Sequence, residues 1–249
     1  MADRQASPLL RYAAVRPRRT HLHVNSYWKQ LSAEEIAAGG HRDFVGGLWD
    51  EMGQLQADFL RDRGMQPDDH LLDMGCGALR GGLHYLRYLQ PGRYYGVDIN
   101  ASLIEAGRRE IELAGLQDRD ATLAVSDDFD AACFGVPFDY AIAVSLFTHL
   151  PAAMIGRCLQ QVAPVLRDGA RTGAGTGVFY ATWFEAPTDD HAAELVHQPG
   201  GVRTYRNMDP FHLSFAELSE LAAAAGLVAE RIGDWGHPRA QMIAAFRRA

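Results

Sequence analysis

The run LLDMGCGALRGG at residues 71–82 constrains the fold more than any other part of the chain. It is typical of a short buried strand that passes through a glycine turn into a helix beginning near Leu79. Glycine at positions 75 and 77 lets the backbone take positive φ values and come close to a ligand. The helix would point its free N–H groups and the positive end of its dipole at that ligand. The run therefore predicts an α/β protein that binds a ligand at the end of this strand.

Two acidic residues lie at the ends of the first two predicted strands. Asp73 comes just before the first glycine, where a dinucleotide-binding strand is usually apolar. Asp98 closes the next apolar run, residues 94–99, and an acid at this place can accept hydrogen bonds from ribose hydroxyls. At these residues the sequence resembles the class I S-adenosylmethionine-dependent methyltransferases. The resemblance implies that the Asp-x-Gly-x-Gly turn holds the methionine part of S-adenosyl-L-methionine and that the second acid holds its ribose.

Predicted strands and helices alternate from residue 70 to the C-terminus. Short connections between them favour a parallel sheet with helices on both faces. The last two strands are separated by Gly-His-Pro and should pair as an antiparallel hairpin at the sheet edge. The expected fold class is therefore α/β: a Rossmann-like, doubly wound, mostly parallel seven-stranded sheet with an antiparallel C-terminal hairpin and an N-terminal helical extension. The expected strands are 71–74, 94–98, 121–125, 138–144, 178–183, 228–232 and 241–246.

Three regions are expected along the chain. Residues 1–25 carry clustered arginines and prolines and should form a flexible basic tail. Residues 26–65 should form two helices, one capped by Ser32 and one with an apolar stripe from Leu48 to Phe59, and the resemblance implies that they are a lid over the cofactor. Residues 66–249 should form the methyltransferase domain, in which the aperiodic insertion 185–213 belongs to the substrate wall.

Charge and cysteine content limit the partners. The formal net charge of −7 leaves no basic stripe for nucleic acid, and no apolar run approaches membrane-spanning length. The N-terminus lacks the apolar segment of a secretory signal. Three separated cysteines without a C-x-x-C motif indicate a reducing compartment and no zinc site. We therefore expect a cytoplasmic protein with a small-molecule partner, no nucleic acid and no membrane; the oligomeric state stays open.

Side chains that follow the strands are the candidate cofactor contacts, because ligands of open parallel sheets bind at the carboxyl ends of the strands. The resemblance implies that Ile99 packs against adenine, that an acid after the third strand contacts the adenine amino group, and that the Ser145 carbonyl faces the cofactor's amino group. Arg80 can pair with the cofactor's carboxylate, since a guanidinium matches that shape. The expected cofactor-binding residues are Asp73, Gly75, Gly77, Arg80, Asp98, Ile99, Asp127, Asp128, Phe129 and Ser145.

Methyl transfer requires alignment of donor and acceptor, and for some acceptors a base. His149 follows the fourth predicted strand, where the methyl group should lie, and is the candidate base; holding the turn at 148–151 is its alternative role. Loops at the carboxyl edge usually set substrate choice, so residues in or beside the insertion are candidate acceptor contacts. These are Tyr180, Arg203, Tyr205 and His212.

Two other functions fit part of the pattern. A nicotinamide-dependent oxidoreductase needs a third glycine three residues after Gly77, where this chain has Arg80. A methyltransferase-like domain that binds without turnover is the non-enzyme alternative. The run at 145–148 is SLFT, unlike the Asn/Asp-Pro-Pro-Tyr of enzymes that methylate DNA bases or glutamine, and no histidines have metal-ligand spacing. The sequence therefore predicts O- or N-methylation of a small molecule without a metal, with the acceptor left open.

Overall fold

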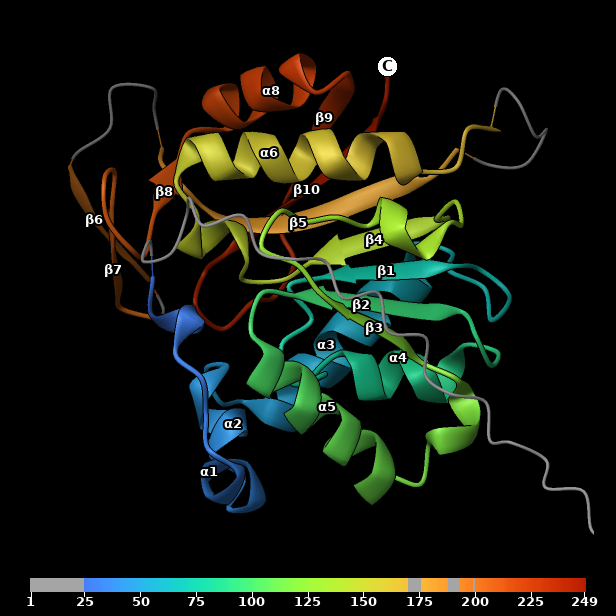
Figure 1. Cartoon of the computed structure of the whole chain (residues 1–249). Helices are drawn as coiled ribbons and strands as arrows, with labels where there is room; N and C mark the ends of the chain where they lie inside the picture. Colours follow the sequence, from blue (N-terminus) through green and yellow to red (C-terminus); the bar gives the residue numbers. More distant parts are fainter. Residues whose placement is uncertain (1–24, 170–175, 188–192, 199) are drawn as a thin grey trace, which may run out of the picture.

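The computed structural model describes residues 25–169, 176–187, 193–198 and 200–249. Its main sheet has the strand order β3-β2-β1-β4-β5-β10-β9, with β8 paired to β5 off this path (Figure 1). β1 to β5 run parallel, and β10 pairs antiparallel with both β5 and β9. The predicted Rossmann-like sheet with a C-terminal hairpin is confirmed, with β8 as an addition. The strands are β1 Leu71–Met74, β2 Tyr94–Asp98, β3 Thr122–Val125, β4 Tyr140–Ala143, β5 Val178–Glu185, β8 His212–Leu213, β9 Leu227–Asp234 and β10 Met242–Arg248.

Helices cover both faces of the sheet, as the strand–helix alternation requires. In Figure 1, α6 (Ala152–Val162) and α8 (Phe215–Ala224) lie over one face, and α3 (Trp49–Asp62), α4 (Gly82–Tyr88) and α5 (Ala101–Leu113) lie under the other. One apolar cluster fills each side, and β1 and β4 contribute buried residues to both. The central strands are therefore fixed from two sides, which holds their carboxyl ends in place.

The glycine turn after β1 is longer than the sequence predicts. Gly75, Gly77 and Leu79 all have positive φ, at 73°, 53° and 69°. A helix cannot begin while the chain is in the left-handed region, so α4 begins at Gly82 rather than near Leu79. The expected helix start is therefore wrong by three positions, and the turn itself, not a helix end, faces the pocket.

The N-terminal segment contains more breaks than expected. α1 (Ala33–Ala37) begins at Ser32 with the predicted cap, completed by the side chain of Glu35. The second predicted helix is confirmed as α3, and α2 (Gly40–Phe44) is an additional helix before it, separated from α3 by residues 46–48, which all have positive φ. A short 3-10 helix, η1 (Ser26–Trp28), precedes them. Most of the expected basic tail, residues 1–24, lies outside the described residues.

A buried ion pair network attaches this N-terminal segment to the sheet domain. Glu110 on α5 is 2% exposed. Its carboxylate lies 2.7 Å from His41 Nε2 and accepts two hydrogen bonds from Arg42, both of 2.8 Å. Burial makes such a network costly to break once one partner is removed. The α1–α2 region is thus fixed on α5, beside the carboxyl edge of the sheet.

The insertion that the sequence shows as aperiodic contains a small two-stranded sheet. β6 (Glu194–His197) and β7 (Val202–Tyr205) form an antiparallel hairpin at the same end of the molecule as α1 and α2, on the left in Figure 1. Both strands have four residues, and only one of these eight residues is buried, so the sequence shows little apolar alternation here. Among the described residues, no helix has the length and apolarity needed to cross a membrane.

Candidate cofactor and acceptor site

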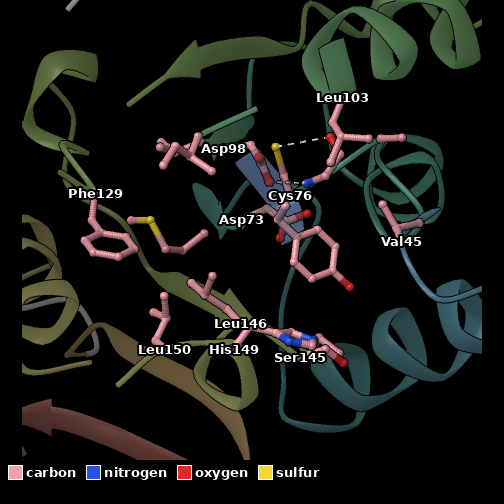
Figure 2. A pocket seen from close by; sticks show the side chains of 18 of the residues that line it. Val45, Asp73, Cys76, Asp98, Leu103, Phe129, Ser145, Leu146, His149 and Leu150 are labelled. Atoms are coloured by element: carbon pink, nitrogen blue, oxygen red, sulfur yellow. Dashed lines mark hydrogen bonds between the residues drawn. The ribbon is translucent and has the colours of Figure 1, made fainter. Parts of the chain in front are cut away.

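A cavity of about 1210 Å³, part of it open to solvent, lies at the carboxyl ends of β1 to β4. The glycine turn, the residues after β2, β3 and β4, and the N-terminal segment contribute to its wall. Figure 2 shows Asp73 and Asp98 in the middle of this wall, with Phe129 and Val45 on opposite sides and His149 beside Ser145. The lining contains a few acidic side chains among mostly apolar ones, as is usual for small-molecule sites.

Asp73 is a buried acid, and no cationic side chain in the described part of the chain is bonded to it. It is 6% exposed, and its Oδ2 accepts a hydrogen bond of 2.8 Å from the Tyr94 hydroxyl. Burial raises the pKa of Asp73 to about 7; the Tyr94 hydrogen bond opposes this shift and the charge of Asp98 adds to it. The carboxylate is thus costly to ionise in the empty pocket, and a bound positive charge would remove that cost.

Asp98 is held by backbone N–H groups. The N–H of Gly77 donates to Oδ2 at 2.9 Å and the N–H of Asn100 donates to Oδ1 at 2.8 Å. Burial raises the pKa of Asp98, while these N–H groups lower it. Asn100 also donates from Nδ2 to the carbonyls of Tyr27 and Lys29, each at 2.8 Å. The acid that the sequence assigns to ribose is therefore oriented by the glycine turn, and its neighbour holds the N-terminal segment against the pocket.

The two glycines of the turn leave room that a side chain would fill. A Cβ atom at Gly75 would lie 3.0 Å from Leu146 Cδ1, and one at Gly77 would lie 3.2 Å from Val45 Cγ1. Both glycines also have positive φ, which disfavours other residues. Backbone atoms of the turn can therefore come close to a ligand, as expected from the sequence.

The acids after β3 point in different directions. Asp127 lines the pocket together with Ile99 and Phe129. Asp128 is not in the lining; its carboxylate accepts hydrogen bonds of 2.7 and 2.6 Å from Arg157. Of the two expected adenine contacts, the structure places only Asp127 at the pocket, because Arg157 on α6 draws Asp128 to the outside.

Ser145, at the end of β4, is held in a strained conformation by β5. Its φ is +61°, and its N–H donates to Thr182 Oγ1 at 2.7 Å. Its carbonyl accepts a hydrogen bond of 2.8 Å from the Thr148 hydroxyl. Strain of this kind is found where the surroundings fix a residue for a ligand, and Ser145 lines the pocket.

His149 forms a pair that the sequence does not reveal. Its Nδ1 lies 2.6 Å from Asp209 Oδ1, and the two side chains are 22% and 23% exposed. The ring also meets Tyr27 edge-on, with 4.8 Å between centroids. Asp209 comes from the chain after the β6–β7 hairpin, which is fixed by the Phe211 N–H that donates to the Thr148 carbonyl at 2.7 Å. The insertion therefore supplies a carboxylate that orients His149 at the pocket.

The other expected acceptor contacts do not line the pocket. Tyr180 is buried under the sheet, edge-on to Phe59 at 5.0 Å. Arg203 pairs with Glu194 across the hairpin, and His212 Nδ1 lies 2.9 Å from Thr204 Oγ1 in the interior. The remaining one, Tyr205, lies on β7 outside the lining. The pocket wall in which these acceptor contacts were expected contains residues of the N-terminal segment instead: Asn25, Tyr27, Trp28, Val45 and Gln56.

Comparisons with known proteins agree with this geometry. A family model described as "Methyltransferase domain" matches residues 72–172, which contain the glycine turn, Asp98 and His149. Residues 72–172 therefore form a methyltransferase domain, in keeping with the resemblance of the sequence to the class I S-adenosylmethionine-dependent methyltransferases. A demethylmenaquinone methyltransferase of Symbiobacterium thermophilum is 29% identical over 128 residues, which are 50% of this chain and 48% of that protein. The chain thus spans about half the length of the curated relative that it matches.

Solved methyltransferases have the same fold at low sequence identity. The magnesium protoporphyrin IX methyltransferase of Synechocystis, solved with S-adenosylmethionine bound, has a TM-score of 0.56 at 14% identity, covering 89% of this chain and 86% of its own. An S-adenosylmethionine-dependent methyltransferase of Clostridium acetobutylicum has a TM-score of 0.61 at 10% identity, covering 88% and 100%. These similarities extend the shared fold beyond residues 72–172.

The residues of this methyltransferase pocket fit the superfamily's cofactor chemically. S-adenosylmethionine carries positive charge on its sulfonium and ammonium groups, and three acids (Asp73, Asp98 and Asp127) line the pocket. Its carboxylate needs a donor, and Arg80 is the arginine in the lining. Gln56, 4% exposed, lies beside Gly81 in this wall, and sequence reasoning missed it because a polar residue on the buried face of an amphipathic helix gives no signal of its own.

Proposed function

We propose that the protein transfers the methyl group of S-adenosyl-L-methionine to a hydroxyl group of a small-molecule acceptor. Methylation of an amine is the second candidate, and catalysis in either case needs no metal. The observation that carries the proposal is the arrangement of Asp73 and Asp98 beside the glycine turn in the same cavity as His149, which is paired with Asp209. We also propose that residues 26–65 act as a lid over the cofactor and that residues 66–249 form the catalytic domain.

The proposed cofactor contacts follow from the charges in the wall. Asp98 accepts hydrogen bonds from the ribose, and Asp73 balances positive charge at the methionine end. Arg80 and Gln56 hold the carboxylate, and Asp127 accepts a hydrogen bond from the adenine amino group. The cofactor, when bound, supplies an electrophilic methyl group on sulfur. The protein's own contribution is then alignment and exclusion of water.

His149 is the proposed proton acceptor. With Nδ1 at Asp209, its Nε2 is the nitrogen available to an acceptor in the pocket. Nε2 would accept the hydroxyl proton when the acceptor oxygen takes the methyl group and the methyl–sulfur bond breaks, and Asp209 would stabilise the imidazolium that results. An acceptor that must lose a proton makes use of this pair, which favours a hydroxyl over a neutral amine.

Binding and turnover test the function separately. Isothermal titration calorimetry should show micromolar affinity for S-adenosyl-L-methionine and no binding of NAD(P)H. A screen of small hydroxyl and amine compounds should then find production of S-adenosyl-L-homocysteine. Binding of NAD(P)H instead would support the oxidoreductase alternative, and cofactor binding without any turnover would support a domain that only binds.

The two acids after β3 provide a matched pair of variants. Asp127→Ala should weaken affinity for S-adenosyl-L-methionine about tenfold, since it removes one hydrogen bond to a polar group. Asp128→Ala should leave that affinity unchanged, because its side chain bonds Arg157 outside the lining. Calorimetric titration of both variants measures the difference. Equal losses would contradict the proposed role of Asp127.

A further inference from the structure

Two guanidinium groups beside the pocket form no ion pair with any carboxylate in the described part of the chain. Arg80, 9% exposed, donates from Nη1 to the carbonyls of Val45 and Gly47, at 3.0 and 2.9 Å. Arg239 donates from Nη2 to the carbonyl of Gly46 at 2.7 Å. The two cations are thus held at adjacent carbonyls of one loop. Carbonyl dipoles offset only part of the cost of burying such charges.

A third donor belongs to the same cluster. His237 is 5% exposed, and its Nδ1 accepts the backbone N–H of Arg239 at 3.0 Å, which leaves the ring hydrogen on Nε2. Burial lowers the pKa of His237 to about 3, with further lowering by Arg80 and Arg239, so the ring is neutral. Burial and then Arg239 also lower the pKa of Arg80. The three side chains therefore lie close together, and all three are donors.

The loop that carries Arg239 is fixed before any ligand arrives. Trp235 donates from Nε1 to the carbonyl of Gln241 at 3.1 Å, and the N–H of Ala240 donates to the carbonyl of His237 at 2.9 Å. The turn of the β6–β7 hairpin packs against it, since a Cβ atom at Gly200 would lie 2.7 Å from Arg239 Cα. A guanidinium held this way loses little entropy on binding.

Tyr27 links this cluster to the acceptor side of the pocket. It lines the cavity, and its ring meets His149 edge-on. Burial and then Asp209 raise the pKa of Tyr27, while Arg80 and Arg239 lower it. The Tyr27 hydroxyl is therefore within electrostatic range of Asp209 and of both arginines. Arg80, Tyr27 and His149 line the same cavity, and Arg239 is bonded to the carbonyl of Gly46, next to the lining residue Val45.

We propose that Arg239 and His237, beside Arg80, form an anion site that binds a carboxylate of the acceptor, so that the acceptor is a hydroxyl compound that also carries an acid group. A guanidinium matches a carboxylate in shape and can bond both of its oxygens. This assignment to the acceptor rests on the proposed function. The cofactor's own carboxylate has the same chemistry, but Arg80 and Gln56 suffice for it, which leaves Arg239 and His237 for a second anion.

Acetate and acetamide, which are nearly identical in shape and differ in charge, are the probes. Protein saturated with S-adenosyl-L-homocysteine is titrated with each probe at constant ionic strength, and the thermal midpoint is followed. Acetate should raise the midpoint and acetamide should not. Arg239→Gln should weaken the acetate response at least about tenfold, the loss expected for a charge-assisted hydrogen bond, and Arg239→Lys should keep part of it. Arg247→Gln, which removes an exposed arginine paired with Glu230, is the charge-matched control and should respond like the wild type.

The outcomes separate this inference from the proposed function. Equal responses to acetate and acetamide, or an acetate response that Arg239→Gln retains, would overturn the inference. So would a response that is seen only in the empty protein, because the cofactor's carboxylate would then be the occupant. Failure to bind S-adenosyl-L-homocysteine would overturn the proposed function itself, and calorimetry measures that step before any acetate is added.

Discussion

Replacing Asp73 by asparagine should stabilise the empty protein by about 4 kcal/mol at about pH 8, while it weakens the affinity for S-adenosyl-L-methionine. Burial raises the pKa of Asp73 from 3.8 to about 7. Each pKa unit corresponds to about 1.4 kcal/mol, so ionising this carboxyl in the folded protein costs about 4 kcal/mol relative to the unfolded chain. Asparagine has nearly the same shape, accepts the Tyr94 hydrogen bond and carries no charge.

The pH dependence has a definite sign. Because the folded-state pKa of Asp73 lies above its unfolded value, the folded protein holds more protons than the unfolded chain between about pH 4 and pH 7. The wild type should therefore lose stability as the pH rises through this window and lose no more above it. The advantage of Asp73→Asn should grow by about 2 kcal/mol between about pH 5.5 and pH 8. Urea unfolding of both proteins at several pH values measures this.

Asp73→Asn, which should stabilise the empty protein, should weaken the binding of the cofactor. A bound cation favours the ionised carboxylate, so binding below about pH 7 should release a proton from Asp73. Asp73→Asn should lose this release and about 10- to 100-fold in affinity, the range for a charge-assisted interaction. Calorimetry in buffers of different ionisation enthalpy detects the proton. A variant that is no more stable than the wild type, or that binds as tightly, would contradict the role given to Asp73.

The local parts of the fold and the site were readable from sequence. The glycine turn and the acids at 73 and 98 lie within a few residues of a strand end, so chain order alone brings them to one edge. The cap at Ser32 is equally local and is confirmed. The prediction was wrong where the backbone leaves the regular regions. Positive φ at Leu79 delays the start of α4, and the short helix α2, which residues 46–48 with positive φ separate from α3, was not predicted. Non-glycine residues give little warning of such conformations.

The acceptor side was not readable, because it is assembled from distant segments. Asp209 meets His149 across 60 residues of chain, and Arg239 reaches Gly46 across 193. Neither separation leaves a periodic signal. Tyr180, which was expected to contact the acceptor, was misplaced for another reason. Seven of the eight residues of β5 are buried, so the alternation of apolar and polar residues does not show on which face of the sheet a side chain lies. Tertiary contacts, not local preference, decide these positions.

Replacing His149 by alanine should have the largest effect on turnover, lowering kcat by about 10²- to 10⁴-fold for a hydroxyl acceptor. The loss follows because the proposed acceptor of the hydroxyl proton is then missing when the oxygen attacks the methyl group. Asp209→Asn should also lower kcat, since the amide neither stabilises an imidazolium nor fixes the same tautomer. The double variant should be little worse than His149→Ala alone, because residues that act as a unit are not additive.

The same variants separate catalysis from folding. Calorimetric affinity for S-adenosyl-L-homocysteine reports whether the pocket of His149→Ala is intact, and added imidazole should restore part of its turnover. Added imidazole should not raise the turnover of Asp209→Asn, because the His149 ring of that variant still occupies the site. If His149→Ala loses less than about fivefold in kcat, the acceptor gives up no proton to this ring; the reaction would then be methylation of a neutral amine, and the His149–Asp209 pair would serve only to hold the hairpin segment against the end of β4.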